Sequence, residues 1–131
     1  MFDTDRRKHP RYPIVLSVTL AIAPNRKRSR ATLMDLSRGG LFLKSTMSVE
    51  LGHAVEVHFR ARPSYACSAV GRVVRIMNTR MLTGFGISFE QTNDNFEKFL
   101  TILDKLKPEL RTQFLRQVLE KSVDIALVGE S

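Results

Sequence analysis

Several residue types that build particular kinds of site are scarce in this chain of 131 residues, which has one cysteine, three histidines and no tryptophan. The single Cys67 excludes an internal disulfide. Because there is also no compact acidic cluster, no credible zinc site remains. No apolar run approaches the roughly 20 residues that a membrane-spanning helix needs, and the first residues lack the apolar core of a signal peptide. These absences favour a cytoplasmic protein without a metal or a cofactor.

Motifs that mark catalysis or a phosphate-binding glycine loop are also missing. The chain has no G-x-S-x-G and no Walker lysine loop, and no G-x-G-x-x-G lies between a strand and a helix. The sequence Gly84-Phe85-Gly86 falls inside a predicted strand, where it is a packing feature. Since no nucleophile stands at a suitable spacing from a base, the sequence predicts a protein that is not an enzyme.

Positive charge is abundant and unevenly placed. The formal net charge is +8, and residues 1–30 hold eight basic side chains against two acidic ones. The basic residues of that part gather in an N-terminal arm, residues 1–12, and in a predicted loop over residues 26–30. Charge concentrated in an arm and a loop indicates a local anion site, although a polynucleotide ligand stays open.

The pattern between the arm and residue 91 is that of β-strands. Apolar residues alternate with other residues in short runs separated by turn residues, and no helical period lies between the runs. Antiparallel pairing in a small barrel or sandwich is therefore expected. Six strands are predicted, over residues 14–23, 31–36, 41–45, 54–59, 66–77 and 82–90. Gly71 interrupts the fifth strand and predicts a bulge or a barrel corner.

The period changes to that of a helix after Gln91. Thr92 or Asn93 can cap a helix whose apolar stripe recurs every three or four residues. Pro108 ends or kinks this helix, and a second helical segment follows. The predicted organisation is an arm, a β body, a helical segment and a tail, over residues 1–12, 13–91, 92–123 and 124–131.

Two short motifs near the N-terminus carry the chemistry. Arg7 and Arg11 are four residues apart on an extended arm, where their guanidinium groups can grip a phosphate and stack on a purine. Asp35 and Ser37 share one side of a strand end, and a carboxylate there can accept hydrogen bonds from the N1–H and N2–H groups of guanine. Gly39 and Gly40 permit a sharp turn and close approach of a ligand. A guanine nucleotide suits this combination.

The ordered pair Arg7-x-x-x-Arg11 and Asp35-x-Ser37-x-x-Gly40, with a strand between its halves, resembles the signature of the PilZ domain, a family of bacterial receptors for cyclic di-GMP. The likeness covers about residues 5–90, including an element at Gly84, Gly86 and Phe89 that is similar to the family's last barrel strand. The resemblance implies a mainly β fold, in which a six-stranded antiparallel barrel precedes one or two C-terminal helices.

The resemblance also implies a role for each motif residue. Arg7 and Arg11 would grip the ligand phosphates and stack on guanine, while Asp35 and Ser37 would bind a guanine edge. Gly40 would preserve the turn. Arg6, directly before the first motif arginine, goes in this family with binding a stacked pair of ligands. The ligand would draw the arm onto the barrel and change contacts with a downstream protein partner.

Two other functions stay open at this point. A module that binds RNA or DNA would use the same arm and the basic loop, and its affinity would fall steeply with salt. A PilZ-like scaffold would work through protein contacts without a ligand. The helical stripe after Asn93 gives that scaffold a surface for a partner or for a homodimer, although packing of the helix on the barrel is its commoner use.

Overall fold

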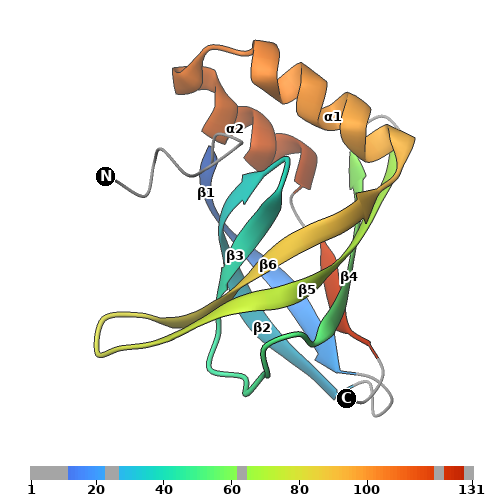
Figure 1. The fold of residues 1–131 in the computed structure, drawn as a ribbon. Helices are drawn as coiled ribbons and strands as arrows, with labels where there is room; N and C mark the ends of the chain where they lie inside the picture. The colour runs from blue at the N-terminus through green and yellow to red at the C-terminus, as the bar shows by residue number, and fades with distance from the viewer. Residues whose placement is uncertain (1–11, 23–26, 62–64, 120–122, 129–131) are drawn as a thin grey trace, which may run out of the picture.

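The computed structural model describes residues 12–22, 27–61, 65–119 and 123–128, and within them seven strands form a closed barrel. In chain order the elements are β1 Tyr12–Ile22, β2 Lys27–Ser37, β3 Gly40–Lys44, β4 Ala54–Ala61, β5 Tyr65–Asn78, β6 Thr83–Thr92, α1 Asp94–Lys105, α2 Pro108–Leu119 and β7 Asp124–Leu127. The strand order around the barrel is β1-β2-β3-β6-β5-β4-β7. Both helices lie across one end of the barrel (Figure 1). The mainly β fold with C-terminal helices is therefore confirmed.

The barrel has one strand more than the sequence predicts. β7 comes from the segment 124–131, which was expected to be a tail, and it pairs parallel with β1 and antiparallel with β4. Ile125 and Leu127 point into the core and are about 1% exposed. Four residues that alternate only twice are too short a pattern to be distinguished from an apolar tail, so periodicity could not find this strand.

The predicted loop over residues 26–30 is also different in the structure. β2 already begins at Lys27, and Lys27 to Arg30 pair in register with residues Thr19 to Ile22 of β1. The charges suggested a solvated loop, but a strand forms where backbone groups find partners, and β1 supplies these partners. The bulge predicted at Gly71 is confirmed by a register shift between Val70 and Gly71.

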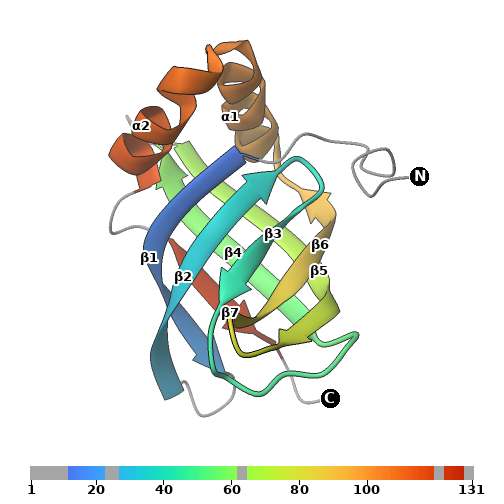
Figure 2. The same ribbon diagram turned by 90° about the vertical axis from the view of Figure 1, so that its left-hand side faces the viewer.

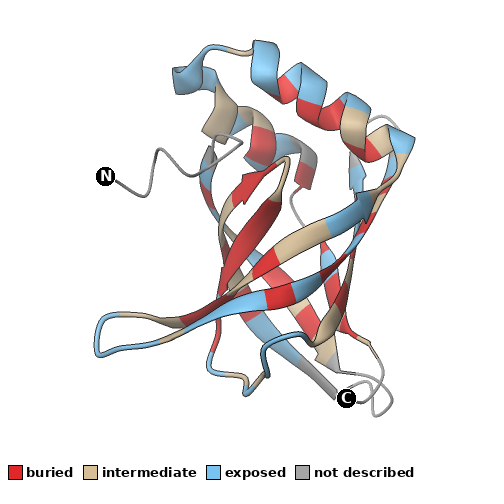
Figure 3. Cartoon of the chain, viewed as in Figure 1, coloured by how far each residue is buried: buried red, intermediate tan, exposed pale blue. Residues whose placement is uncertain are grey.

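The helices close the barrel end because their apolar faces are buried against it. α1 begins at the N-cap Asn93, whose Oδ1 accepts a hydrogen bond from the Phe96 amide at 2.9 Å. The stretches of α1 coloured as buried lie on its side toward the barrel (Figure 3), and the buried residues are Phe96, Phe99, Leu100 and Leu103. Phe59 of β4 meets both Phe96 and Phe99 edge to face, with ring centroids 5.2 Å apart. The predicted stripe therefore packs on the barrel.

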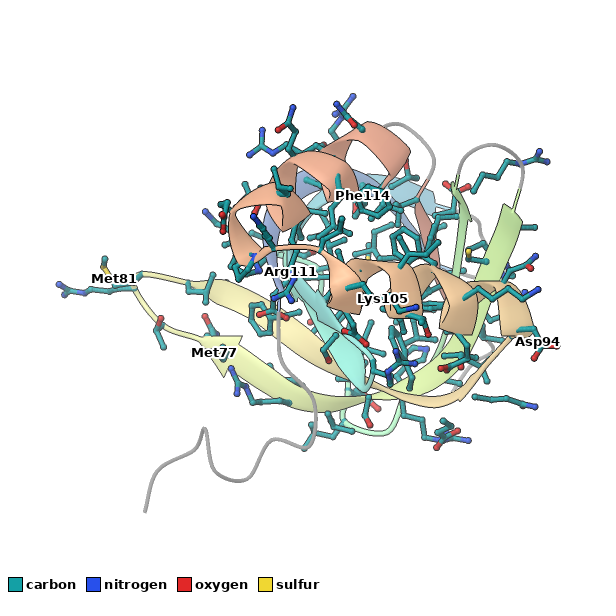
Figure 4. The ribbon with its side chains drawn as sticks, turned by 90° about the horizontal axis from the view of Figure 1, so that it is seen from above. Met77, Met81, Asp94, Lys105, Arg111 and Phe114 are labelled. Atoms are coloured by element: carbon teal, nitrogen blue, oxygen red, sulfur yellow. The ribbon has the colours of Figure 1, made fainter. Side chains whose placement is uncertain are left out.

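The two helices contact each other as well as the barrel. Pro108 is the first residue of α2, while α1 already ends at Lys105. Arg111 donates hydrogen bonds to the carbonyl groups of Leu103 and Asp104, each at 3.2 Å, and so satisfies the C-terminal end of α1. Figure 4, seen from above, shows Phe114 of α2 and Lys105 of α1 over the barrel, whereas Met81 lies far from both.

Candidate functional site

The second predicted motif occupies the turn from β2 to β3, at the end of the barrel that carries the helices (Figure 2). Asp35 and Ser37 close β2, and Gly40 opens β3 opposite Ser37. Asp35 is half-buried and stands between Pro13 of β1 and Phe42 of β3 in the strand register. The structure thus brings the predicted residues Asp35, Ser37, Gly39 and Gly40 together. Arg6, Arg7 and Arg11 lie outside the described residues.

The hydroxyl group of Ser37 is bound within the turn itself. Ser37 is 6% exposed, and its Oγ accepts a hydrogen bond from the Gly39 amide at 3.1 Å. The same Oγ donates to the Gly40 carbonyl at 3.4 Å. A serine that satisfies backbone groups of its own turn fixes the shape of that turn. Its direct contact with a guanine edge stays a prediction.

Gly40 is required by the neighbouring strand and not by its own backbone angles. A Cβ atom added at Gly40 would stand 2.0 Å from the carbonyl oxygen of Ile87 on β6. The Gly39 carbonyl accepts a hydrogen bond from the Phe89 amide of the same strand at 2.9 Å. β6 therefore holds the turn from one side, and only a glycine allows the approach.

Arg38, which the sequence did not single out, ties the turn to helix α1. Its Nη2 lies 2.8 Å from Asp104 Oδ2, and its Nη1 pairs with Glu97 Oε1. The pKa of the Arg38 guanidinium is raised, first by the hydrogen bond to Asp104 and then by the charges of Asp104 and Glu97, which outweigh burial. Glu97 and Asp104 are seven residues apart, so they share one helix face. The spacing of these two carboxylates was the one signal in the sequence for an ion pair on this helix face, but it does not identify Arg38 as the partner.

A second attachment holds the start of β1 beside the motif. Thr112 of α2 donates its hydroxyl hydrogen to the Pro13 carbonyl at 3.2 Å. The register of β1 shifts between Pro13 and Leu16, and Val15 in this bulge has a φ of 52°. A β-branched residue rarely adopts such an angle. The chain is therefore held in an unusual conformation three residues after Tyr12, where the described part begins.

One row of residues crosses five strands at the level of Asp35. In register, Pro13 is opposite Asp35, Asp35 opposite Phe42, Phe42 opposite Gly86 and Gly86 opposite Arg75. The Arg75 guanidinium carbon lies 5.6 Å from the centroid of the Phe42 ring. Gly86 has no side chain, so the row combines a carboxylate, an aromatic ring, a gap and a guanidinium group. Because the Phe42 ring is 5% exposed, the exposed guanidinium of Arg75 is the flat surface that this row offers to a planar ring, and Asp35 offers the hydrogen-bond acceptors.

Within the described ranges, no three His, Cys, Asp or Glu side chains gather closely enough to hold a metal ion. No helix in those ranges is long and apolar enough to cross a membrane. Cys67 is 1% exposed and is part of the barrel core.

Comparison with known proteins agrees with the motif and the fold. A family model described as the PilZ domain matches residues 5–103, which is most of the chain and includes both motifs. Curated proteins offer no match to the chain. The likeness seen in the sequence is therefore confirmed over strands β1 to β6 and most of α1, and the chain belongs to the PilZ domain family.

Proposed function

We propose that this chain is a cyclic di-GMP receptor, and that it acts by binding and not as an enzyme. The family to which it belongs consists of binding and adaptor modules for this messenger. The observation that carries the proposal is the pairing of Pro13 with Asp35. Arg11 is two residues before Pro13 in the sequence, and Pro13 is opposite the carboxylate that would hold guanine.

The two motifs then divide the ligand between them. Arg7 and Arg11 bind the phosphate groups, because a guanidinium fork matches phosphate oxygens. Asp35 accepts hydrogen bonds from a guanine edge, and Ser37 and Gly40 keep the turn in the shape that presents it. Arg75 of the cross-strand row, exposed and packed over the buried Phe42 ring, adds a guanidinium plane for stacking. Arg6 would support a second, stacked ligand, which makes two ligands per chain the expected stoichiometry.

Binding would be passed on through the helices. Arg38 sits inside the motif turn and holds Glu97 and Asp104 of α1, while Thr112 of α2 holds the carbonyl group of Pro13. A ligand that draws the arm and the turn together therefore acts on both helices. In the bacterial cytoplasm, where this messenger is made, the altered helical end would change contacts with a downstream protein.

A calorimetric titration of the whole chain with cyclic di-GMP tests the proposal. Asp35→Ala and Arg7→Ala should each weaken binding by about 10- to 100-fold, since each removes a charge-assisted hydrogen bond. Asp124→Ala and Arg80→Ala are the matched controls, because both residues are exposed and neither belongs to the motifs. Wild-type affinity in both motif variants would overturn the site. If the wild-type chain does not bind cyclic di-GMP, the remaining function is that of a PilZ-like scaffold that works through protein contacts without a ligand.

The nucleic-acid alternative predicts a different titration. Binding to a random oligonucleotide would fall steeply with salt and would compete with cyclic di-GMP on the same arm. Base stacking needs open aromatic rings, but each phenylalanine side chain that the structure describes is buried or half-buried. Competition between the two ligands at low and high salt separates the two functions.

A further inference from the structure

A polar cavity lies at the end of the barrel away from the helices. It has a volume of about 600 Å³ and is bounded by β2, the end of β3 and the turn between β5 and β6. Three cationic side chains and several hydroxyl groups line it, among them Arg30, Lys44, Arg80, Thr32, Thr46 and Thr83. Arg30 is five residues before Asp35 on the same strand, which corresponds to about 16 Å. The cavity is therefore separate from the motif turn.

The three cations of this cavity have no carboxylate among its lining residues. Arg30 donates to the hydroxyl oxygen of Ser17 at 3.1 Å, which leaves its charge uncompensated. Within the described part of the chain, Lys44 and Arg80 belong to no ion pair, whereas Arg38 and Arg72 each pair with acidic residues. Uncompensated positive charge around a concave surface attracts an anionic partner.

The same place has a free backbone edge. β3 ends with Lys44 opposite Thr32, so among the described residues β2 from Lys27 to Ala31 is paired on one side only, with β1. The Thr19 amide donates toward Val123, on the side of β1 away from β2. Because both polar groups of a strand residue point the same way, Thr19 and its partner Arg30 form a pair without hydrogen bonds between them. The amide and carbonyl groups of Arg30 therefore face the side on which β3 has ended.

We propose that this surface binds an extended acidic segment of a partner protein, which adds to the edge of β2 at Arg30. Backbone groups of the segment pair with the amide and carbonyl of Arg30, and its carboxylates lie near Arg30, Lys44 and Arg80. Met81, 89% exposed in the adjoining turn, provides an apolar contact, and Figure 4 shows it far to one side of the helices. This site does not depend on whether the chain binds cyclic di-GMP.

The positive charge of the cavity and the unpaired edge of β2 together favour an acidic peptide over other occupants. A second copy of this chain carries a formal charge of +8 and brings the wrong sign to the surface. A nucleic acid has the right sign, but its backbone has no alternating amide and carbonyl groups to pair with a strand edge. An acidic peptide meets both requirements.

Selection of a random peptide library on the immobilised whole chain, without cyclic di-GMP, tests the proposal. The selected peptides should be acidic and rich in β-forming residues. The strongest one is then measured by fluorescence anisotropy against variants of the chain. Arg30→Ala and Lys44→Glu should each weaken it by about tenfold or more. Lys98→Glu, a charge reversal on an exposed face of α1, should leave its affinity unchanged.

The backbone part of the proposal has its own variant. Arg30→Pro removes the charge and also the outward amide, while the hydrogen bonds between β1 and β2 stay intact. It should therefore bind more weakly than Arg30→Ala. If Arg30→Pro fails to fold, N-methylation of alternate residues in the peptide replaces it and should abolish binding. The proposal would be overturned if the selected peptides lacked acidic residues, or if neither Arg30→Pro nor N-methylation of the peptide changed the affinity. That result would mean that the cations only protect an exposed edge from aggregation.

Discussion

β2 is held on both sides at its C-terminal end and on one side at its N-terminal end. Near Asp35 and Ser37 it pairs with β1 and β3, and the following turn is bonded to β6 and to α1. Near Arg30 it pairs with β1 alone, and the neighbouring cations have no acidic partner in the cavity. One end thus has a fixed shape, as the proposed small-ligand site requires, and the other leaves hydrogen-bonding capacity and charge for the proposed partner segment.

The largest effect is expected for Gly40→Ala, which tests how tightly the motif end is held. The added methyl group would meet the Ile87 carbonyl at 2.0 Å, and neither backbone can move without breaking the pairing of β3 with β6. We expect the free energy of unfolding to fall by about 3 kcal/mol. Urea denaturation followed by circular dichroism measures this change.

Gly86→Ala is the matched control for that substitution. Its Cβ would meet the Phe42 ring at 3.6 Å, an ordinary contact, although Gly86 is in the same strand as Ile87. Stability should stay the same or rise by about 0.5 kcal/mol, since alanine is less flexible than glycine when unfolded. Equal losses in the two variants would show that the close approach at Gly40 is not what the motif glycine protects.

Ser37→Ala should have an intermediate effect, because it takes the acceptor away from the Gly39 amide in a half-buried turn. A loss of about 1–2 kcal/mol is expected in the same unfolding assay. Ser48→Ala, at an exposed serine, serves as the control and should change stability by less than about 0.5 kcal/mol. A Ser37→Ala variant as stable as the control would mean that the hydroxyl serves the ligand and not the turn.

The smallest effect compares two arginines outside β2, Arg38 in the turn after its C-terminal end and Arg80 in the cavity beside its N-terminal end. Arg38→Ala should cost about 0.5–1 kcal/mol, since its ion pairs with Glu97 and Asp104 are partly exposed, and the loss should shrink in high salt. Arg80→Ala removes a cation without an acidic partner in its cavity and should change stability by less than about 0.5 kcal/mol. Thermal unfolding of both variants at two salt concentrations measures this difference. An equal change of stability with salt in the two variants would contradict it.

The sequence predicts the motif end of the molecule better than the other end. Leu33 alternates with its neighbours, and glycines follow at the turn. These two signals locate β2, β3 and the turn that follows Asp35, because local pattern and local turn chemistry agree there. Asn93 as the helix cap and the stripe from Phe96 to Leu103 follow from spacing in the same way. These features need no knowledge of distant partners.

The features that the sequence does not predict depend on contacts between distant parts of the chain. β7 is recognisable as a strand only because β1 and β4 leave a gap that it fills. Arg38 looks like any surface arginine until α1 brings Glu97 and Asp104 to it. The charges at Lys27 and Arg28 suggest a loop, and only the pairing with β1 makes them part of a strand.

A two-dimensional NMR titration of the labelled whole chain with cyclic di-GMP tests the central claim most directly, because it reports both ends of β2 at once. The amide signals of Ser37, Gly39 and Gly40 should shift most, followed by those of α1 residues near Glu97, while those of Arg30, Lys44 and Arg80 stay in place. Shifts that gather around Arg30 and Lys44, or no shifts at saturating ligand, would contradict a receptor site at the motif turn.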